Sequence, residues 1–442
     1  MNFNDTLQYL FSLGHETLAI KLGLKNTEML LEGLGNPQRA FESVQIAGTN
    51  GKGSTAVILD SICRAAGVRT GLYTSPHLVS VTERIKVDGT DISEDDFAKY
   101  ASEVRGAAED LVGRGKLATL PTFFEQVTAI ALLAFRDAGV RLAILETGLG
   151  GRLDATTVAE AATVAITPLA LDHQEYLGET LEEIAFEKAS IIRHGVTAII
   201  APQPDSALDV VLRRCADCDV EPVVIDQTAS RVEAVTNDGC LIVTFETSEA
   251  RYERVRLGLR GRHQIVNAAV AIALAEALRK PGFEISQSAI IEGVEQARHE
   301  GRLELLQGHP SLLFDGAHNP SGALALREFL DEFVKVPLTL VFGAMKDKKL
   351  AEIGSILFPV ANNLILTQPD NPRAAGIAEL QGVAGQSIES KKIVMALTPN
   401  EALQKAKDVT PTEGVICVTG SLYLVGEFKA LINAGLLSQV GH

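Results

Sequence analysis

The chain has 442 residues, of which 46% are hydrophobic and 22% are charged, and its formal net charge is −16. This length predicts two or three domains rather than a single core. The negative charge argues against general binding to nucleic acid or anionic membranes, although a local basic pocket could still hold an anion. We find no apolar run of about 18 residues and no basic segment before an apolar core at the N-terminus, so neither a membrane span nor a secretory signal is expected.

Five cysteines at irregular spacing fit a reduced, cytoplasmic enzyme. Cys215 and Cys218 form a lone Cys-x-x-Cys pair, which could indicate a metal or redox site. No second pair and no nearby histidine completes such a site. We therefore interpret the two residues as ordinary thiols in a helix-to-strand segment.

Helices and strands alternate along the first 200 residues. Residues 4–40 are predicted to be mostly helical from the spacing of their leucines. Strands are predicted at 44–47, 70–74, 141–146, 162–167 and 196–201, and helices at 52–66, 123–138 and 182–192. This alternation predicts an α/β fold, in which helices cover both faces of a mostly parallel sheet.

The pattern changes twice in the second half of the chain. Residues 219–260 are rich in strands and turns, which predicts a small β insertion before a helix at 264–278. The alternation then restarts after Gly301, with strands at 312–315, 338–343, 364–367 and 415–419 and helices at 321–329, 349–358 and from 422 onward. We expect an N-terminal domain over residues 1–300 and a smaller C-terminal Rossmann-like domain over residues 301–442.

The most informative segment is residues 44–56, a short strand followed by a Gly-rich turn with Lys52 and then a helix. Backbone N–H groups in such a turn bind oxyanions, and the lysine adds a mobile positive charge. The segment departs from a standard Walker A loop, because Ile46 stands where that loop has its first glycine. Gly53 follows the lysine, so the nearest hydroxyl, on Ser54, comes one position late. This variant loop predicts a particular kind of ATP-using protein. We therefore expect residues 1–300 to form an N-terminal ATPase domain of the P-loop type.

Two polar residues follow strands of the first predicted domain. Glu146 ends a buried strand before a Gly-rich turn, which is where P-loop enzymes hold Mg²⁺. His173 follows the strand at 162–167, which we predict to be the neighbour of the strand of Glu146. This arrangement would bring the imidazole toward the same edge of the sheet, where ligands bind in open α/β sheets.

Asp315 and His318 follow the first strand of the second predicted domain, so they would face the cleft between the domains. Asn319 before Pro320 also fits a helix cap, and both interpretations can hold together. By its local surroundings alone, Lys188 is an ordinary lysine on a helix surface.

Eight short motifs occur in one order along nearly the whole chain, from about Tyr9 to Gly426. They are residues 47–54, 74–78, 82–85, 146–155, 171–173, 187–189, 301–304 and 315–320. Together they resemble the folylpolyglutamate synthase family of the Mur ligase superfamily, and within it the bacterial bifunctional type. One departure is Thr157, where the family usually has Asn, and it lies just beyond the expected substrate-contact stretch.

The resemblance implies an ATP-dependent amide ligase of folate metabolism. In that family ATP phosphorylates a substrate carboxylate, and the amine of L-glutamate then attacks the acyl phosphate. The expected acceptor is dihydropteroate, a reduced folate with or without glutamates, or both. The expected cofactors are ATP and Mg²⁺ at two sites, and the enzyme is expected to be a cytoplasmic monomer with no nucleic-acid or membrane partner.

The resemblance also implies residue roles. The expected nucleotide-contacting residues are Gly48, Thr49, Asn50, Gly51, Lys52, Gly53, Ser54, Asn267, Arg302 and Asp315. The expected ligands of one Mg²⁺ are Ser75 and Glu146, and those of a second are Glu146 and His173. Lys188 corresponds to a carbamylated lysine, and the catalytic candidates are Lys52, Glu146, His173, Lys188 and His318. The expected substrate contacts are Thr122, Phe123, Phe124, Glu125, Leu153, Asp154 and Ala155, where a flat pterin could stack on the Phe pair.

Three other interpretations fit less well. A Mur ligase for a nucleotide-linked cell-wall precursor would carry an extra domain before the loop, whereas 45 residues precede Ile46. A GTPase-like switch would need Asn-Lys-x-Asp, and residues 346–348 lack the Asn. A non-catalytic protein with a relict ATP site is disfavoured by the joint presence of Lys52, Glu146, His173 and Lys188.

Overall fold

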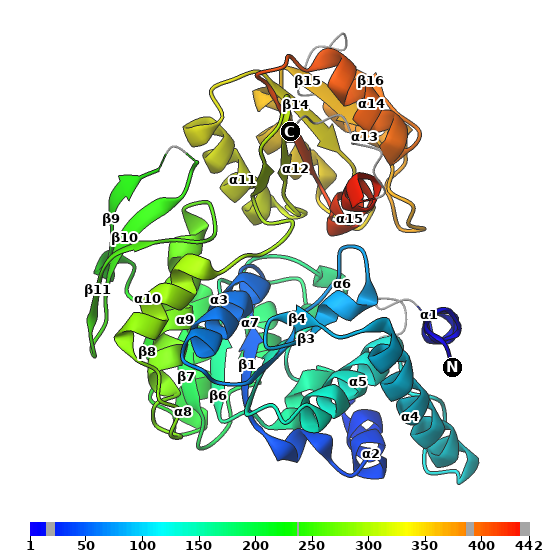
Figure 1. Cartoon of the computed structure of the whole chain (residues 1–442), viewed down its shortest axis with the longest axis vertical. Coiled ribbons are helices and arrows are strands. Elements are labelled where there is room, and N and C mark those ends of the chain that lie inside the picture. The colour runs from blue at the N-terminus through cyan, green and yellow to red at the C-terminus, as the bar shows by residue number, and fades with distance from the viewer. Residues whose placement is uncertain (15–22, 237, 386–392, 434–442) are drawn as a thin grey trace.

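The structure is a computed structural model that describes residues 1–14, 23–236, 238–385 and 393–433. We call residues 1–300 the N-terminal region and residues 301–433 the C-terminal region. Figure 1 shows the two regions one above the other, with the C-terminal region at the top. Part of the segment predicted as mostly helical, residues 15–22, lies outside the described residues.

The N-terminal region is built on an eight-stranded sheet of order β4-β3-β2-β5-β1-β6-β7-β8. The parallel strands are β1 (Glu42–Ala47), β2 (Thr70–Tyr73), β5 (Leu142–Glu146), β6 (Thr163–Ile166), β7 (Thr197–Ile200) and β8 (Val223–Val224). An antiparallel edge is formed by β3 (Ile85–Val87) and β4 (Thr90–Asp91). The mostly parallel sheet that the sequence predicts is therefore confirmed.

Helices cover both faces of this sheet because its strands are buried on both sides. Along β5, Ile144 contributes to one core cluster, whereas Ala143 and Leu145 contribute to another. The first face carries α3 (Lys52–Ala65), α9 (His263–Ala277) and α10 (Gln287–Gln296). The second face carries α1 (Phe3–Ser12), α2 (Lys25–Gly33), α4 (Glu94–Gly113), α5 (Phe123–Asp137), α7 (Leu181–Ala189) and α8 (Asp205–Asp217). The short helix α6 (Gln174–Leu177) follows the loop after β6.

The expected β insertion is an antiparallel sheet of β9 (Ser230–Val235), β10 (Leu241–Glu246) and β11 (Arg251–Arg256). It packs beside α9 and α10 at the left of Figure 1. Short 3-10 helices lie at η1 (Pro37–Ala40), η2 (Val81–Arg84), η3 (Ala155–Ala159), η4 (Gln227–Ala229) and η5 (Phe358–Val360).

The C-terminal region has its own six-stranded sheet of order β12-β13-β17-β14-β15-β16. Its strands are β12 (Glu304–Leu306), β13 (Ser311–Phe314), β14 (Leu338–Phe342), β15 (Asn363–Leu366), β16 (Ile393–Met395) and β17 (Val415–Thr419), and only β12 is antiparallel. Its helices are α11 (Pro320–Phe333), α12 (Leu350–Leu357), α13 (Ile377–Ala384), α14 (Pro399–Val409) and α15 (Leu422–Leu431). This sheet agrees with the Rossmann-like pattern expected after Gly301.

One prediction about the sheet is wrong. The strand of Glu146, β5, and the strand before His173, β6, are not neighbours, because β1 pairs with both and lies between them. Crossover helices can place successive parallel strands on either side of a central strand, so chain order does not decide sheet order. Both residues still reach one edge, because parallel strands end at the same edge.

Two further observations concern the Cys-x-x-Cys pair and membrane-spanning helices. Cys215 lies in α8 and Cys218 caps it, and both thiols are buried and free. The Cys218 thiol donates to the Ile192 carbonyl oxygen at 3.4 Å, as a packed structural thiol can. Of the helices in the described ranges, none is long and apolar enough to cross a membrane.

Candidate active site

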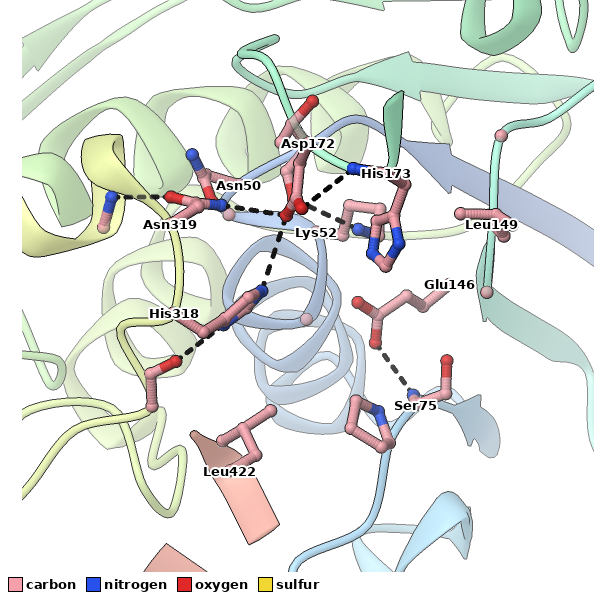
Figure 2. Close-up of a pocket in the computed structure, with 18 of the residues that line it drawn as sticks. Asn50, Lys52, Ser75, Glu146, Leu149, Asp172, His173, His318, Asn319 and Leu422 are labelled. Atoms are coloured by element: carbon pink, nitrogen blue, oxygen red, sulfur yellow. Dashed lines mark hydrogen bonds and ion pairs between the residues drawn. The ribbon is translucent and has the colours of Figure 1, made fainter. Parts of the chain in front are cut away.

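A cavity of about 520 Å³ lies between the two regions, at the carboxyl ends of the first sheet's strands. Figure 2 shows residues of both regions pointing into it. Predicted site residues that line it are Thr49, Asn50, Gly51, Lys52, Gly53, Ser54, Ser75, Thr122, Phe124, Glu125, Glu146, Leu153, Asp154, Ala155, His173, Lys188, Asn267, Arg302, Asp315 and His318. Of the predicted set, Gly48 and Phe123 are described residues that do not line it. The structure therefore brings together side chains that are far apart in the sequence.

The phosphate loop joins β1 to α3 and holds its shape through glycine and backbone contacts. Gly48 has φ +152°, and a Cβ there would overlap the Thr167 hydroxyl. Gly51 has φ +86°, and a Cβ there would overlap the Asn267 side chain. The backbone N–H groups of Thr49 and Asn50 both donate to the Pro168 carbonyl oxygen at 3.1 Å. The loop is thus fixed by backbone geometry that favours glycine.

A buried polar chain supports the helix end of this loop. The Ser54 hydroxyl lies 3.2 Å from His299 Nδ1 and accepts a hydrogen bond from Gln264 Nε2 at 3.3 Å. The Gln264 amide oxygen in turn accepts from Asn267 Nδ2 at 2.8 Å. Burial and then Arg302 lower the pKa of His299 to about 3, so its imidazole is neutral at pH 7. Gln264 and His299 were not predicted, because neither lies in a motif with phosphate-binding character.

Glu146 lies at the carboxyl end of β5, next to the phosphate loop. Its Oε2 accepts a hydrogen bond from the Ser75 backbone N–H at 3.1 Å. Burial raises the pKa of this carboxyl, while Lys52 and the Ser75 amide act in the opposite direction. A buried carboxylate needs a positive partner, so this position suits a bound cation.

The loop after Ser75 is held by the carboxylate of Glu83, which was not predicted as a site residue. Glu83 accepts hydrogen bonds from the backbone N–H groups of Leu78, Val79 and Ser80, at 2.7, 2.9 and 2.7 Å. Glu83 also completes a capping box with Ser80 at the start of η2. Its place in the motif at residues 82–85 was a usable signal, but the motif alone did not show that the side chain shapes this loop.

Lys188 contradicts the local interpretation of a lysine on a helix surface. Its side chain is buried, and Nζ donates to the Gly48 carbonyl oxygen at 2.8 Å. Burial, followed by the charge of Lys52, lowers the pKa of Lys188 to about 7. A buried amine that is half neutral near pH 7 is a chemically reactive group beside the phosphate loop.

The two predicted phenylalanines have different surroundings. Phe124 lines the cavity and lies over Gly148, where a Cβ would overlap its ring. Phe123 is buried, with the Phe11 ring stacked at 5.9 Å from its centroid and the Arg84 guanidinium 5.3 Å from it. Only the Phe124 ring is therefore placed to face a ligand in this cavity.

Asp154 shapes the Gly-rich turn after Glu146. Its carboxylate accepts hydrogen bonds from the backbone N–H groups of Gly148 and Leu149 at 2.8 and 3.0 Å. Thr157, the one departure from the family pattern, donates to the Gly151 carbonyl oxygen at 2.7 Å. Asp154 and Thr157 thus hold the turn from two sides, while Asp154 also borders the cavity.

The C-terminal region contributes the turn between β13 and α11. Asp315 is buried and accepts from the Leu303 and Ala317 backbone N–H groups at 3.0 and 2.9 Å. Burial raises the pKa of Asp315, and Arg302 opposes that shift. His318 Nδ1 lies 2.8 Å from the Gly316 carbonyl oxygen, which leaves Nε2 facing the cavity.

Asp172 is a further residue that was not predicted, and it lies between the regions. Its carboxylate accepts from Lys348 Nζ at 2.7 Å and from Asn319 Nδ2 at 3.1 Å. His318 Nε2 lies 3.6 Å from the same group. Burial alone would raise the pKa of Asp172, but the hydrogen bond and charge of His318, with His173 and Lys348, hold it well below its usual range. Figure 2 shows this carboxylate at the centre of the contacts.

Comparison with known proteins places this site in a family. The profile of the Mur ligase middle domain matches residues 46–275, and that of the Mur ligase glutamate ligase domain matches residues 301–422. A dihydrofolate synthase/folylpolyglutamate synthase of Bacillus subtilis is 34% identical over 94% of this chain and 96% of its own length. This chain belongs to the folylpolyglutamate synthase family of Mur ligases.

Solved structures of the family show the same fold. A Mycobacterium tuberculosis folylpolyglutamate synthase complexed with ADP aligns with a TM-score of 0.90 at 31% identity, over 97% of this chain and 98% of that one. An Escherichia coli protein in complex with DHPP and ADP aligns with a TM-score of 0.86 at 30% identity, over 98% of each chain. As a member of this family, the chain is an ATP-dependent, ADP-forming ligase that adds glutamate in folate metabolism and uses a divalent metal.

The predicted metal ligands suit such an ion. Burial lowers the pKa of His173 to about 3, so its imidazole is in the neutral form that binds metals. Glu146 supplies a buried carboxylate, and Ser75 an oxygen donor in the same cavity. Within the described residues no three His, Cys, Asp or Glu side chains form a complete metal cluster, and the predicted set holds two of those types. The carboxylate and hydroxyl oxygens of this set fit Mg²⁺ or Mn²⁺.

Proposed function

We propose that this ligase adds L-glutamate both to dihydropteroate and to reduced folates, through an acyl phosphate. The observation that carries the proposal is that one cavity holds the phosphate loop, Glu146 and Phe124 together with the turn of His318. Bifunctional relatives such as that of Escherichia coli, 32% identical over 97% of this chain, support the choice of two acceptors.

The chain's own residues then have distinct tasks. The N–H groups at the start of α3 and the Lys52 ammonium bind the ATP phosphates, and Asn267, Arg302 and Asp315 contact the nucleotide. Phe124 offers its face to the pterin of the acceptor. Ser75 and Glu146 would hold one Mg²⁺, Glu146 and His173 would hold a second, and the ions would supply positive charge against the phosphates.

The reaction follows from the poor reactivity of a carboxylate toward an amine. An acceptor carboxylate oxygen attacks the γ-phosphorus, and the bond to the β–γ bridging oxygen breaks to release ADP. The neutral amine of glutamate attacks the acyl carbon, the C–N bond forms, and inorganic phosphate leaves with the C–O electron pair while the nitrogen loses a proton. Lys52 lowers the energy of the transferring phosphoryl group because it places positive charge where negative charge builds.

We further propose that Lys188 carries a carbamate. Its buried amine has a pKa of about 7, so a large neutral fraction exists at physiological pH to react with CO₂. The product is an anion where Lys52 otherwise adds unfavourable positive charge. Electron density for an unmodified lysine at high bicarbonate would count against this proposal.

The boundary between domains is proposed at residues 300 and 301, and the enzyme is proposed to act as a monomer without nucleic-acid partners. Five buried, free cysteines support a reducing compartment such as the cytoplasm.

The deciding test is glutamate-dependent ADP release with each acceptor in turn. Turnover with dihydropteroate and with a reduced folate monoglutamate is expected. Turnover with only one acceptor would restrict the activity to that acceptor. No stimulation by either acceptor would remove the proposed function.

A further inference from the structure

The phosphate and metal chemistry of the site leaves one buried carboxylate, Asp172, without a task. It follows β6 in the N-terminal region, yet most of its partners belong to the C-terminal region. Lys348 reaches it from the loop after β14, and Asn319 and His318 reach it from the turn before α11. Asn319 Nδ2 also lies 3.0 Å from the Asn50 amide oxygen of the phosphate loop. Asp172 therefore lies where the C-terminal region meets the phosphate loop.

The pair formed by Asp172 and Lys348 is much more buried than another ion pair across the regions. The two side chains are only 9% and 8% exposed. Arg262 and Glu332 also pair across the regions, at 2.8 Å, but these side chains are 46% and 31% exposed. Removing one partner of a buried pair leaves an uncompensated charge, whereas an exposed pair contributes little.

Apolar contacts elsewhere keep the two regions attached without Asp172. Leu78 of the N-terminal region packs against the core of the C-terminal region. Gly426 in α15 approaches so closely that a Cβ there would overlap the Leu78 carbonyl oxygen. Loss of the Asp172 contacts would thus free one end of the interface and leave the other in place.

We propose that Asp172 is a positioning residue that locks the C-terminal region over the phosphate loop in the closed arrangement. In this proposal Asp172 acts through its contacts with Lys348 and Asn319. Asp172 could also affect turnover through His173. Its Oδ1 accepts a hydrogen bond from the His173 backbone N–H at 2.9 Å, and His173 has φ +52°. The test must separate the lock from this effect on a metal ligand.

The experiment measures the distance between the regions by pulsed electron paramagnetic resonance in the full chain. Nitroxides are attached at Arg114→Cys and Leu397→Cys, both exposed positions, while the five native cysteines are buried. Asp172→Asn keeps the shape and removes the charge, and Lys348→Met removes the partner without touching the contact to His173. Arg262→Gln is the matched control at the exposed pair.

Both Asp172→Asn and Lys348→Met are expected to broaden the distance distribution to longer values, and Arg262→Gln to leave it unchanged. The double variant is expected to resemble the single ones, because both remove the same contact. Turnover should fall about tenfold or more in both single variants. This turnover readout rests on the proposed function, whereas the distance readout does not.

An unchanged distance distribution in Lys348→Met would overturn the proposal, whatever the turnover. A loss of turnover in Asp172→Asn with an unchanged distance and a raised Mg²⁺ requirement would do the same, since it assigns the effect to His173. If Asp172→Asn fails to fold, Lys348→Met decides alone.

Discussion

The two sides of the cleft are built on different physical principles. The phosphate-loop side uses backbone geometry, with glycines at positive φ and N–H groups tied to the Pro168 carbonyl oxygen. The C-terminal side reaches the same cavity with side chains, chiefly Lys348, His318 and Asn319. The backbone cradle is held by contacts inside the N-terminal region, to Pro168, Thr167 and Asn267, whereas the side-chain contacts exist only while the two regions are docked. This difference suggests that the phosphate site is permanent and that its completion depends on closure.

The largest expected effect tests the phosphate side. Glu146→Gln removes a buried negative charge at the metal position and should lower turnover by about 100-fold or more, with a higher Mg²⁺ requirement. Steady-state rates over a Mg²⁺ titration measure both quantities. Glu175→Gln, on the exposed surface of α6, is the control and should behave as the unsubstituted enzyme. Unchanged Mg²⁺ dependence in the Glu146 variant would remove that residue from the site.

A glycine substitution tests whether backbone geometry builds the cradle. Gly48→Ala places a methyl group against the Thr167 hydroxyl, and residue 48 has φ +152°, which an alanine rarely adopts. ATP binding measured by calorimetry should therefore weaken at least about tenfold. Gly67→Ala also has positive φ, +73°, but meets nothing within 4 Å. That control should lose about 1 kcal/mol of stability and retain ATP affinity. Equal ATP affinities in the two variants would contradict the cradle.

A pH titration tests the buried lysine on the same side. Because the pKa of Lys188 is lowered to about 7, protonation dominates below that pH and the neutral amine dominates above it. The neutral fraction should rise from about one tenth at pH 6 to about nine tenths at pH 8. Stimulation of turnover by bicarbonate should therefore grow over this interval and vanish in Lys188→Met. Stimulation that is independent of pH would contradict the carbamate.

The smallest expected effect lies at the exposed pair between the regions. Arg262→Gln removes a bidentate contact to Glu332, but the two side chains are 46% and 31% exposed. Thermal unfolding should show a loss of less than about 1 kcal/mol, and turnover should not change. A loss as large as that of Lys348→Met would show that the exposed pair also controls closure, and it would weaken the contrast between the two contacts.

Sequence reasoning was strongest where a short segment determines its own structure. Strand-to-helix alternation predicted both parallel sheets, and the turn with Lys52 predicted the loop between β1 and α3. The ends of predicted strands also placed Glu146 beside the phosphate loop and Asp315 and His318 at a cleft between the domains, and all three residues line the cavity. These features follow from the spacing of hydrophobic residues and the positions of glycines, and both signals lie within segments of about a dozen residues.

Other features had no local signal. His299 and Ser54 are 245 positions apart, and Lys348 and Asp172 are 176 apart. Glu83 and Asp172 did lie in motifs, so their presence could be noticed but their hydrogen-bond partners could not. The different surroundings of Phe123 and Phe124 depend on how α5 packs against Phe11 and Gly148.

The sequence by itself determined the fold class, the phosphate loop and the family, because each rests on local periodicity or on motifs in a set order. Only the tertiary structure decided that β1 separates β5 from β6, that Lys188 is buried, and that Asp172 joins the two regions. The physical reason is that burial and charge pairing depend on which distant segments pack together. The local sequence around a helical lysine is the same whether its amine is exposed to solvent or donates to a loop carbonyl oxygen, as that of Lys188 does.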